Sequence, residues 1–596
     1  MVEAEVLPAS GALREANEDL SRLLELVGKP RWATSVLVAL GLLSSLAEAV
    51  GITLILLFIY AVTGQTDTAI IGGGAVGNLL RESTDRFGGT VPLAVLIMVL
   101  IVVRATLSLA YSLVSVSISE GISERARNMV HHQYLTASYE FVQGHEQSQL
   151  LEILGTESWY VAGAYSNFTR LIINCCSILV FGIFLLAISW KITLVALAGF
   201  LLISAGLRHL SAPARTLGFK TKEVHQSLAE HMLKTLQAMR AIRAYAQESA
   251  HQRRFEDSSG QARQTSMALV RLSSWIGPAT DVGYFAILCI IIAGSGLWGV
   301  SFAVTLAAVA LLYRLQPQTR ELESKLLSFA QMQPQLHSLR MMIEPDKDYP
   351  PVGSQPVHSI GTAIQFSDVH FAYTGNDIPV LDGVSFSIPA GVTTAIVGTS
   401  GAGKTTIVNL LLRLYQPRSG RILVDGTSLD VLRRDDWLSM IGVAGQDVDL
   451  VEGTVIDNIR MSNENASQEA VIEAARSAGV AEFIEPLAEG YDTWIGQEGL
   501  RFSGGQRQRI GLARALLRNP QFLILDEAMS ALDRGLEDRI RHEIENRLAG
   551  RTMLIITHRL ETVANAGHAI WIADGQVKAE GEPTKILSLA DTRSVS

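Results

Sequence analysis

Six long apolar runs constrain the fold of this chain more than any other feature. Each approaches or exceeds the roughly 20 residues that an α-helix needs to cross the hydrocarbon core of a bilayer. Hydrophobic residues make up 48% of the 596 residues, and the mean hydropathy of +0.26 is high for a soluble protein. We therefore expect an all-α transmembrane domain with six helices in the N-terminal half, at about 33–63, 92–118, 161–189, 192–210, 278–299 and 302–322.

The distribution of lysine and arginine between the runs predicts the orientation of this domain. Cytoplasmic connections of membrane proteins carry an excess of both residues. The connections on one side hold only Arg81, Arg86 and Lys191, whereas the segments on the other side are rich in basic residues. Both termini are therefore expected in the cytoplasm, together with Arg14, Arg22, Lys29, Arg31, Arg125, Arg127, Lys220, Lys222, Lys234, Arg240, Arg243, Arg253 and Arg254.

Two segments flank the first run. The outer stretch Gly77–Phe87 fits either a short surface helix or an ordered polar loop. The N-terminal residues 1–30 lack the pattern of a signal peptide. They have the spacing of an amphipathic cytoplasmic helix, with one face formed by Leu20, Leu23, Leu24 and Val27.

Helical patterns continue from the membrane runs into two cytoplasmic segments. These segments span about 119–160 and 211–275. Each must turn back toward the membrane, and such turns are natural contacts for a partner domain. We expect these coupling contacts at 138–141 in the first segment and at about 231–240 in the second.

Three charged residues, Glu48, Arg104 and Arg314, lie inside the predicted spans. A charge at the centre of a bilayer costs about 2.5–3.5 kcal/mol or more, so these side chains are expected to face away from lipid. Two interpretations fit: a polar substrate cavity between the helices, or a structural ion pair such as Glu48 with Arg104. A Glu48 carboxylate that faced a cavity would favour a cationic group on the cargo.

Net charge and cysteine content narrow the class of protein. The net charge of −9 argues against the basic surface of a nucleic-acid-binding protein, so no nucleic-acid partner is expected. Cys175, Cys176 and Cys289 lie in apolar runs without the spacing of metal ligands. We expect all three to be buried free thiols.

A polar, proline-rich stretch, Glu344–Pro351, separates two halves of different composition. After it, short strand patterns alternate with helical patterns, which is typical of an α/β domain. The predicted division is an N-terminal cytoplasmic helix at 1–30, a transmembrane domain at 31–340, a linker at 341–361 and an α/β domain at 362–596.

A glycine-rich loop at residues 398–406 is the most specific motif of the C-terminal half. It reads Gly-Thr-Ser-Gly-Ala-Gly-Lys-Thr-Thr and lies between a strand-like run at 394–397 and a helical run at 405–415. This context predicts a cradle in which backbone N–H groups bind the phosphates of a nucleotide. Lys404 would add a positive charge, and the Thr405 hydroxyl would bind Mg²⁺.

A second nucleotide motif follows much later, at Phe522–Glu527. Its apolar run is typical of a buried parallel strand, and it ends in two carboxylates. Because ligands bind beyond the carboxyl ends of such strands, Asp526 is expected to hold Mg²⁺. Glu527 would act as the general base toward the attacking water.

A third motif, Phe502–Arg509, opens a helix that is expected to run to Leu517. It reads Phe-Ser-Gly-Gly-Gln-Arg-Gln-Arg, and a Ser-Gly-Gly turn at a helix N-terminus is an anion site. The domain already has one phosphate cradle. A second anion site therefore suggests a contact with ATP that is held by a neighbouring copy.

With these three motifs, the domain resembles the nucleotide-binding domain of ATP-binding-cassette (ABC) proteins, whose signature is Leu-Ser-Gly-Gly-Gln. The whole chain is similar to an ABC exporter half-transporter, and more loosely to lipid-linked-oligosaccharide flippases and some peptide exporters. The resemblance implies a multi-domain membrane protein: an all-α six-helix transmembrane domain followed by an α/β P-loop ATPase domain of ABC type. It also implies a bacterial inner membrane and a homodimer or heterodimer whose ATPase domains pair head to tail around ATP and Mg²⁺.

The resemblance also assigns roles to residues at matching positions. Catalytic roles fall to Glu527, His558 and Gln446, and Mg²⁺ ligation falls to Thr405, Gln446 and Asp526. Tyr373 would stack on adenine. The other implied ATP contacts are Gly398, Ser400, Gly401, Ala402, Gly403, Lys404, Thr405 and Thr406 in the phosphate loop, Ser503, Gly504, Gly505 and Gln506 in the signature, and Asp533 in the loop Ser530–Asp533 that links the two sites.

The chain departs from the family pattern at three positions. Phe502 replaces the signature leucine, Gly445 stands where a proline often precedes the glutamine, and Gln497 replaces the usual glutamate of the exporter-specific loop. None of these is a catalytic position, so a homodimer would have two competent sites.

Three functions compete at this stage. The first is ATP-driven export or flipping of an amphipathic substrate, such as a lipid, lipid-linked sugar, peptide or drug-like molecule. The second, an ABC ATPase acting on DNA or ribosomes, is disfavoured by the six spans. The third is an ATP-gated regulatory or channel-like protein without net pumping, and the intact Glu527 and His558 favour turnover over it. The residues before the first run are too few for a peptidase domain, so a leader-cleaving peptide exporter is not expected.

Overall fold

The structure is a computed structural model that describes residues 9–28, 32–63, 90–144, 147–211, 214–298, 300, 302–344, 353–375, 378–446, 448–496 and 502–591. The chain divides into two compact units. The helical unit comprises Met1–Thr136 and His145–Pro345, and the α/β unit comprises Ala137–Gly144 and Asp346–Ser596. Each unit has its own hydrophobic core.

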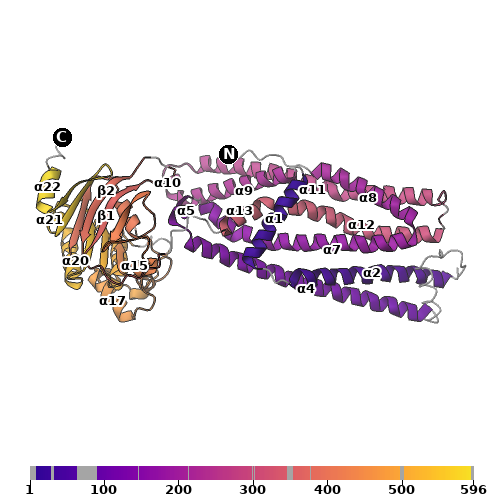
Figure 1. The fold of residues 1–596 in the computed structure, drawn as a ribbon, viewed down its shortest axis with the longest axis horizontal. Coiled ribbons are helices and arrows are strands. Elements are labelled where there is room, and N and C mark those ends of the chain that lie inside the picture. The colour runs from indigo at the N-terminus through magenta and orange to yellow at the C-terminus, as the bar shows by residue number, and fades with distance from the viewer. Residues whose placement is uncertain are drawn as a thin grey trace. The chain divides into compact units, whose positions relative to one another are not determined.

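In the helical unit the long helices run side by side, and α1 lies across them (Figure 1). Helix α2 packs against α4 and α7, and α1 packs against α13 and α12. A π-helical segment, Ile153–Glu157, joins α6 to α7. The described helices are α1 (Ala9–Val27), α2 (Ala33–Thr63), α4 (Thr90–Thr136), α6 (Gln147–Glu152), α7 (Ser158–Ile188), α8 (Trp190–Ser211), α9 (Ala214–Gln237), α10 (Met239–Ala244), α11 (Glu248–Ser295), α12 (Phe302–Gln331) and α13 (Gln333–Ile343).

Four of the six predicted runs lie within long helices, and the runs 161–189 and 278–299 begin in α7 and α11 and extend past the ends of these helices. The helices differ in apolar character. Among the described residues, four helices are long and apolar enough to cross a membrane: Ala33–Ile55, Val91–Thr136, Ser158–Ile188 and Glu248–Ser295. The apolar part of α8, Trp190–Gly206, is shorter. Helix α12 turns polar from Arg314 onward. Its charged side chains therefore need protein partners or water rather than lipid.

Helix α1 confirms the predicted amphipathic face. Its four predicted apolar residues are at most 5% exposed, because this face packs on other helices of the unit. Asp19 on the same helix is buried and pairs with Arg340 of α13 at 2.6 Å. The predicted outer segment Gly77–Phe87 lies outside the described residues.

The prediction of buried cysteines is wrong for two of the three. All three thiols are free, but Cys175 and Cys289 are exposed and Cys176 is partly buried. The physical reason is that a membrane helix is apolar on its outer surface as well. An apolar run therefore indicates burial in lipid or protein, without distinguishing the two.

The α/β unit contains a four-stranded sheet of order β2-β1-β4-β5 and a six-stranded sheet of order β10-β9-β3-β8-β7-β6. In the larger sheet, β9, β3, β8, β7 and β6 are parallel and β10 is antiparallel. The strands are β1 (Ala363–Phe371), β2 (Leu381–Pro389), β3 (Thr393–Gly398), β4 (Ser419–Val424), β5 (Thr427–Ser428), β6 (Ile441–Ala444), β7 (Phe522–Asp526), β8 (Thr552–Ile556), β9 (His568–Ala573) and β10 (Gln576–Gly581).

Helices pack around these sheets (Figure 1). Strands β7 and β8 are buried along their whole length, as expected for central parallel strands. The helices are α5 (Tyr139–Gly144), α14 (Lys404–Leu411), α15 (Arg434–Ser439), α16 (Val455–Arg460), α17 (Gln468–Ser477), α18 (Ala481–Ile484), α19 (Gly504–Leu517), α20 (Arg534–Arg547), α21 (Leu560–Ala564) and α22 (Pro583–Asp591), with a 3₁₀ turn at Gly490–Asp492.

The predicted helix at 405–415 is four residues too long. Helix α14 ends at Leu411, and Arg413 adopts a left-handed conformation with φ of +54°. The Arg413 guanidinium donates to the carbonyl oxygens of Leu432 at 2.7 Å and Asp430 at 3.2 Å. This distant turn ends the helix, whereas the local apolar pattern would have continued it.

Candidate functional site

The phosphate loop lies between β3 and α14, at the carboxyl end of a parallel strand. Gly401 and Gly403 adopt φ of +83° and +98°, which side chains other than glycine rarely tolerate. The Lys404 ammonium donates to the carbonyl oxygens of Gly398 and Thr399 at 3.0 and 2.9 Å. The loop thus presents its lysine and the N-terminus of α14 together, which is the arrangement of an anion site.

Not every predicted phosphate-loop residue offers its side chain to a ligand. Ser400 and Gly401 are exposed. Ala402 and Thr406 are 3% and 4% exposed, so their side chains lie in the core behind the loop. Only the backbone N–H groups of these two residues remain candidates for phosphate contacts.

Asp526 ends β7 and lies next to the start of α14. The pKa of its carboxyl group is raised, mainly because the group is buried, and the nearby Glu527 charge raises it further. A hydrogen bond from Thr405 and the positive charge of Lys404 lower the pKa, but they do not outweigh burial. The described residues contain no group of three or more His, Cys, Asp and Glu side chains that would hold a metal alone. One carboxylate beside one hydroxyl fits Mg²⁺, which binds through few protein ligands and completes its shell with phosphates and water.

Glu527 follows in a left-handed conformation with φ of +49°. Its N–H donates to the Ile556 carbonyl at 3.1 Å, and its own carbonyl accepts from the Ser530 N–H at 3.0 Å. His558, which follows β8, places Nδ1 3.6 Å from the Glu527 carboxylate. The carboxylate and the imidazole therefore face each other at the edge of the sheet.

Gln446 and the signature segment line one open pocket, together with Val448, Asp449, Leu450, Gly504, Arg507, Gln508, Ser530 and Ala531. Gln446 itself is exposed beyond the end of β6. Ser503 caps α19 through a capping box: its hydroxyl accepts from the Gln506 N–H at 3.3 Å, and the Gln506 side chain accepts from the Ser503 N–H at 2.8 Å. The predicted helix end at Leu517 is confirmed.

The structure brings one set of predicted residues together. Lys404, Thr405, Asp526, Glu527 and His558 form one constellation. In the described part of the chain, no hydrogen bond or ion pair joins residues 503–506 to the phosphate loop.

Tyr373 lies in an aromatic cluster beside α14. Its hydroxyl is 3.0 Å from the Thr406 hydroxyl. Its ring meets those of Phe371 and Tyr415 edge to face, with centroids at 4.9 and 5.2 Å. The sequence does not predict that Tyr415 contacts Tyr373. The only sequence feature that could have indicated this contact is the position of Tyr415 shortly after the phosphate-loop helix.

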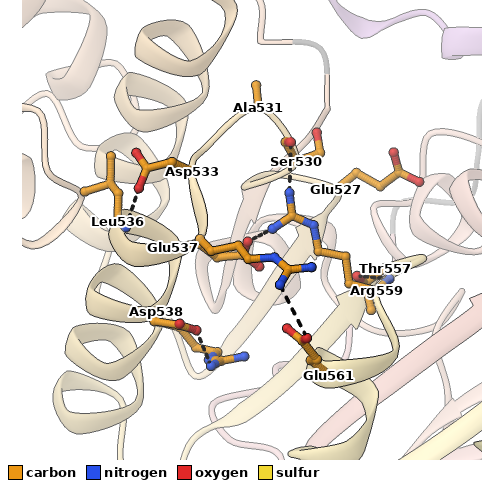
Figure 2. A network of polar contacts seen from close by, with 12 residues as sticks. Glu527, Ser530, Ala531, Asp533, Leu536, Glu537, Asp538, Thr557, Arg559 and Glu561 are labelled. Carbon is orange, nitrogen blue, oxygen red and sulfur yellow. Dashed lines mark hydrogen bonds and ion pairs between the residues drawn. The ribbon is translucent and has the colours of Figure 1, made fainter.

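Two further residues near the constellation were also missed. Gln508 is 5% exposed, and its side-chain amide contacts Gln446, Glu527 and Ser530. Arg559 follows His558 and pairs with Glu537 of α20 (Figure 2). Gln508 belongs to the motif at 502–509 and Arg559 is the neighbour of a predicted site residue, but their partners lie far away along the chain. Gln497 lies outside the described residues.

The three charged residues of the helical unit form one cluster. Glu48 is 8% exposed and pairs with Arg104 at 3.1 Å and also with Arg314. The guanidinium side chains are 40% and 39% exposed. The Glu48–Arg104 pair considered from the sequence is thus present, but a second arginine completes it. Each carboxylate oxygen of Glu48 thus contacts one arginine.

Two family descriptions match this chain: "ABC transporter transmembrane region" over residues 35–312 and "ABC transporter" over residues 381–530. An ATP-dependent lipid A-core flippase of Chromobacterium violaceum is 32% identical over 68% of this chain and 70% of its own length. The heterocyst differentiation ATP-binding protein HepA of Nostoc sp. is 27% identical over 91% of this chain and 89% of its own.

Two further similarities cover the ATPase region and the fold. A beta-(1-->2)glucan export ATP-binding/permease protein NdvA of Rhizobium etli is 46% identical over 39% of each chain. A solved bacterial Atm1-family ABC exporter with ATP bound has a TM-score of 0.79 and 22% identity, and the match covers 94% of this chain and 95% of that one. At this identity the likeness concerns the fold.

Proposed function

The chain belongs to the ABC transporter family and is an integral membrane ATPase, and from this premise we propose that it exports or flips an amphipathic substrate by alternating access. The observation that carries the proposal is the constellation of Lys404, Asp526, Glu527 and His558 in a chain with long apolar helices. The names of the relatives, a lipid A-core flippase and a glucan exporter, support a large amphipathic or carbohydrate-bearing cargo.

The chemistry follows from the chain's own side chains. Lys404 and the N-terminus of α14 neutralise the phosphates of ATP. Glu527 accepts a proton from the water that attacks the γ-phosphorus, while the bond to ADP breaks and phosphate leaves. His558 lies 3.6 Å from the Glu527 carboxylate and would contact the same phosphate. Thr405, Asp526 and Gln446 would hold Mg²⁺, which stabilises negative charge on the transferred group when bound.

The finer assembly is part of the proposal. Two copies pair head to tail, so that Ser503–Gln506 and Asp533 of one copy complete the ATP site of the other; a similar half would give a heterodimer instead. The helical unit contributes six spans with both termini in the cytoplasm, in the inner membrane of a bacterium. ATP brings the two ATPase domains together, and this closure favours the outward-open state of the membrane helices. ATP can shift this equilibrium only because it binds more tightly to that state.

The charged cluster of the helical unit bears on the cargo. Two guanidinium groups face one carboxylate, so the cluster carries one positive charge in excess. Each arginine has N–H groups beyond those that contact Glu48, because a guanidinium has five donors. An unbalanced charge among apolar helices is costly. The cluster therefore favours an anionic head group, such as a phosphate, over the cationic group considered from the sequence.

We expect ATP hydrolysis by the purified protein in lipid nanodiscs, stimulated by one class of cargo. Glu527→Gln should lower kcat by about 10²–10⁴-fold, because it removes the general base. Anionic lipids and lipid-linked sugar phosphates should stimulate more than neutral lipids with the same chains. The triple variant Glu48→Gln/Arg104→Gln/Arg314→Gln, which leaves no unpaired buried carboxylate, should lose this preference while it keeps basal hydrolysis.

The alternative, a regulatory or channel-like protein without pumping, predicts a different result. Wild-type protein that binds ATP but hydrolyses it no faster than Glu527→Gln would contradict the proposed pump. Equal stimulation by anionic and neutral cargo would contradict the charge preference alone and leave the pump intact.

A further inference from the structure

The turn Ser530–Asp533 lies between Glu527 and α20 and is called the linking turn. The side chains of Gln508 and Arg559, to which no role in the site has been assigned, form hydrogen bonds with it. Asp533 caps α20, because its carboxylate accepts from the Leu536 N–H at 3.0 Å. The turn is short, and Ser530 donates its N–H to the Glu527 carbonyl. A shift of the turn would therefore move Glu527 directly.

Arg559, in the loop that follows β8, contacts the linking turn (Figure 2). Its guanidinium donates to the Ser530 carbonyl at 3.1 Å and pairs with the carboxylate of Glu537 on α20. The Glu537 side chain is only 9% exposed. A carboxylate this buried needs a charged partner, so the pair fixes the direction of Arg559. The loop that carries His558 is thereby tied to the linking turn.

Gln508 holds the same turn from the side of the signature helix α19. Its Nε2 donates to the Ser530 hydroxyl, the Glu527 carbonyl and the Gln446 carbonyl at 3.3–3.4 Å. Its Oε1 accepts from the Ala531 N–H at 3.1 Å. One buried amide thus joins α19 to Gln446, Glu527 and the linking turn.

We propose that Gln508 and the Arg559–Glu537 pair are positioning residues that fix the linking turn and, through it, the placement of Glu527 relative to His558 and α19. The inference rests on the proposed function, in which these groups act on ATP. Glu527 depends on such support, because its left-handed backbone is unfavourable and persists only where neighbours impose it. Loss of the support would slow hydrolysis without weakening ATP binding by the phosphate loop.

The test compares Arg559→Met/Glu537→Gln with wild type. The double variant removes both charges, so no unpaired buried carboxylate remains to unfold the domain. We expect kcat to fall at least about tenfold with KM for ATP unchanged within about twofold, because a small misplacement of a catalytic group is costly. Hydrogen exchange of the Ser530–Leu532 amides should accelerate. Gln508→Met should show the same separation of kcat from KM.

Two further variants keep the test sharp. Arg534→Gln/Glu561→Gln removes an ion pair in which the two side chains are 3.9 Å apart and both exposed, and this variant should behave as wild type. Arg559→Lys keeps a charge beside Glu537 and should fold if the double variant does not. It should still show faster exchange in the turn.

The proposal is overturned if wild-type exchange and kcat persist in Arg559→Met/Glu537→Gln and Arg559→Lys. It is equally overturned if kcat falls only in step with the thermal midpoint or with a rise in KM. If the proposed function were wrong, the wild-type protein would hydrolyse ATP no faster than Glu527→Gln. Hydrogen exchange of the Ser530–Leu532 amides would still measure whether Arg559 and Glu537 stabilise the linking turn.

Discussion

Gly401 and Gly403 of the phosphate loop differ in which atoms surround them. Both have positive φ, so any side chain there is strained by about 1–2 kcal/mol. A Cβ on Gly403 would also lie 2.6 Å from Cδ2 of Leu381 and 3.1 Å from the Val380 carbonyl. A Cβ on Gly401 would meet nothing within 4 Å. The loop is therefore pressed against the start of β2 at one glycine only.

Gly403→Ala should weaken ATP binding by about 100-fold or more, because strain and collision together displace the start of α14. Gly401→Ala, which adds strain alone, should lose about tenfold or less. Equilibrium titration with a fluorescent ATP analogue measures both. Equal losses would mean that backbone strain, rather than the contact with Leu381, decides the shape of the loop.

Asp425, in the turn between β4 and β5, binds the backbone at the start of β1. Its carboxylate accepts from the N–H groups of Gly361, Thr362 and Ala363 at 2.7, 2.7 and 3.1 Å. Burial would raise the pKa of Asp425, but these hydrogen bonds outweigh it and lower the pKa below 3.8. A lowered pKa stabilises the folded state above the unfolded-state value, and this stabilisation is lost as the pH falls through the folded-state value.

Asp425→Asn should lower the free energy of unfolding at pH 7 by about 1 kcal/mol, because the site is exposed and screened by solvent. The thermal midpoint would fall by about 2–4 °C. The gap to wild type should be constant at neutral pH, begin to narrow below about pH 4, and close only when the pH falls through the lowered folded-state pKa, where wild-type Asp425 is neutral too. Scanning fluorimetry across pH, with the exposed Glu464→Gln as control, measures it. A gap that persists at low pH would contradict the charge argument.

A short segment from the N-terminal half of the sequence belongs to the α/β unit. Helix α5 lies in residues 137–144, which cluster with residues 346–596. The Tyr139 ring meets Tyr415 edge to face at 5.7 Å, and Thr374 donates to the Glu140 carboxylate. These contacts agree with the coupling site predicted at 138–141. The other predicted turn, 231–240, belongs to the helical unit.

Tyr139→Ala should reduce stimulation of ATP hydrolysis by cargo about two- to tenfold and leave basal hydrolysis intact. An edge-to-face aromatic pair contributes about 0.5–1.5 kcal/mol, which sets this range. Tyr139→Phe keeps the ring and should retain stimulation. If Tyr139→Ala were stimulated as strongly as Tyr139→Phe, the aromatic contact would play no part in coupling.

Patterns over a few neighbouring residues were enough to predict much of this protein. The six apolar runs, the amphipathic face of α1, the buried strand β7 and the phosphate loop each depend on local spacing. The motif at 502–509 then identified the family resemblance. Local spacing determines such features because helix and strand periodicity act within one or two turns of chain.

The tertiary structure alone decided which distant side chains meet. It added Arg314 to the pair of Glu48 and Arg104, turned two cysteines outward and ended α14 through a bond to a remote turn. It also joined Gln508 and Arg559 to the linking turn. These contacts depend on how separate elements pack, and the free energy of a buried charge or amide is fixed by its partner rather than by its neighbours in sequence.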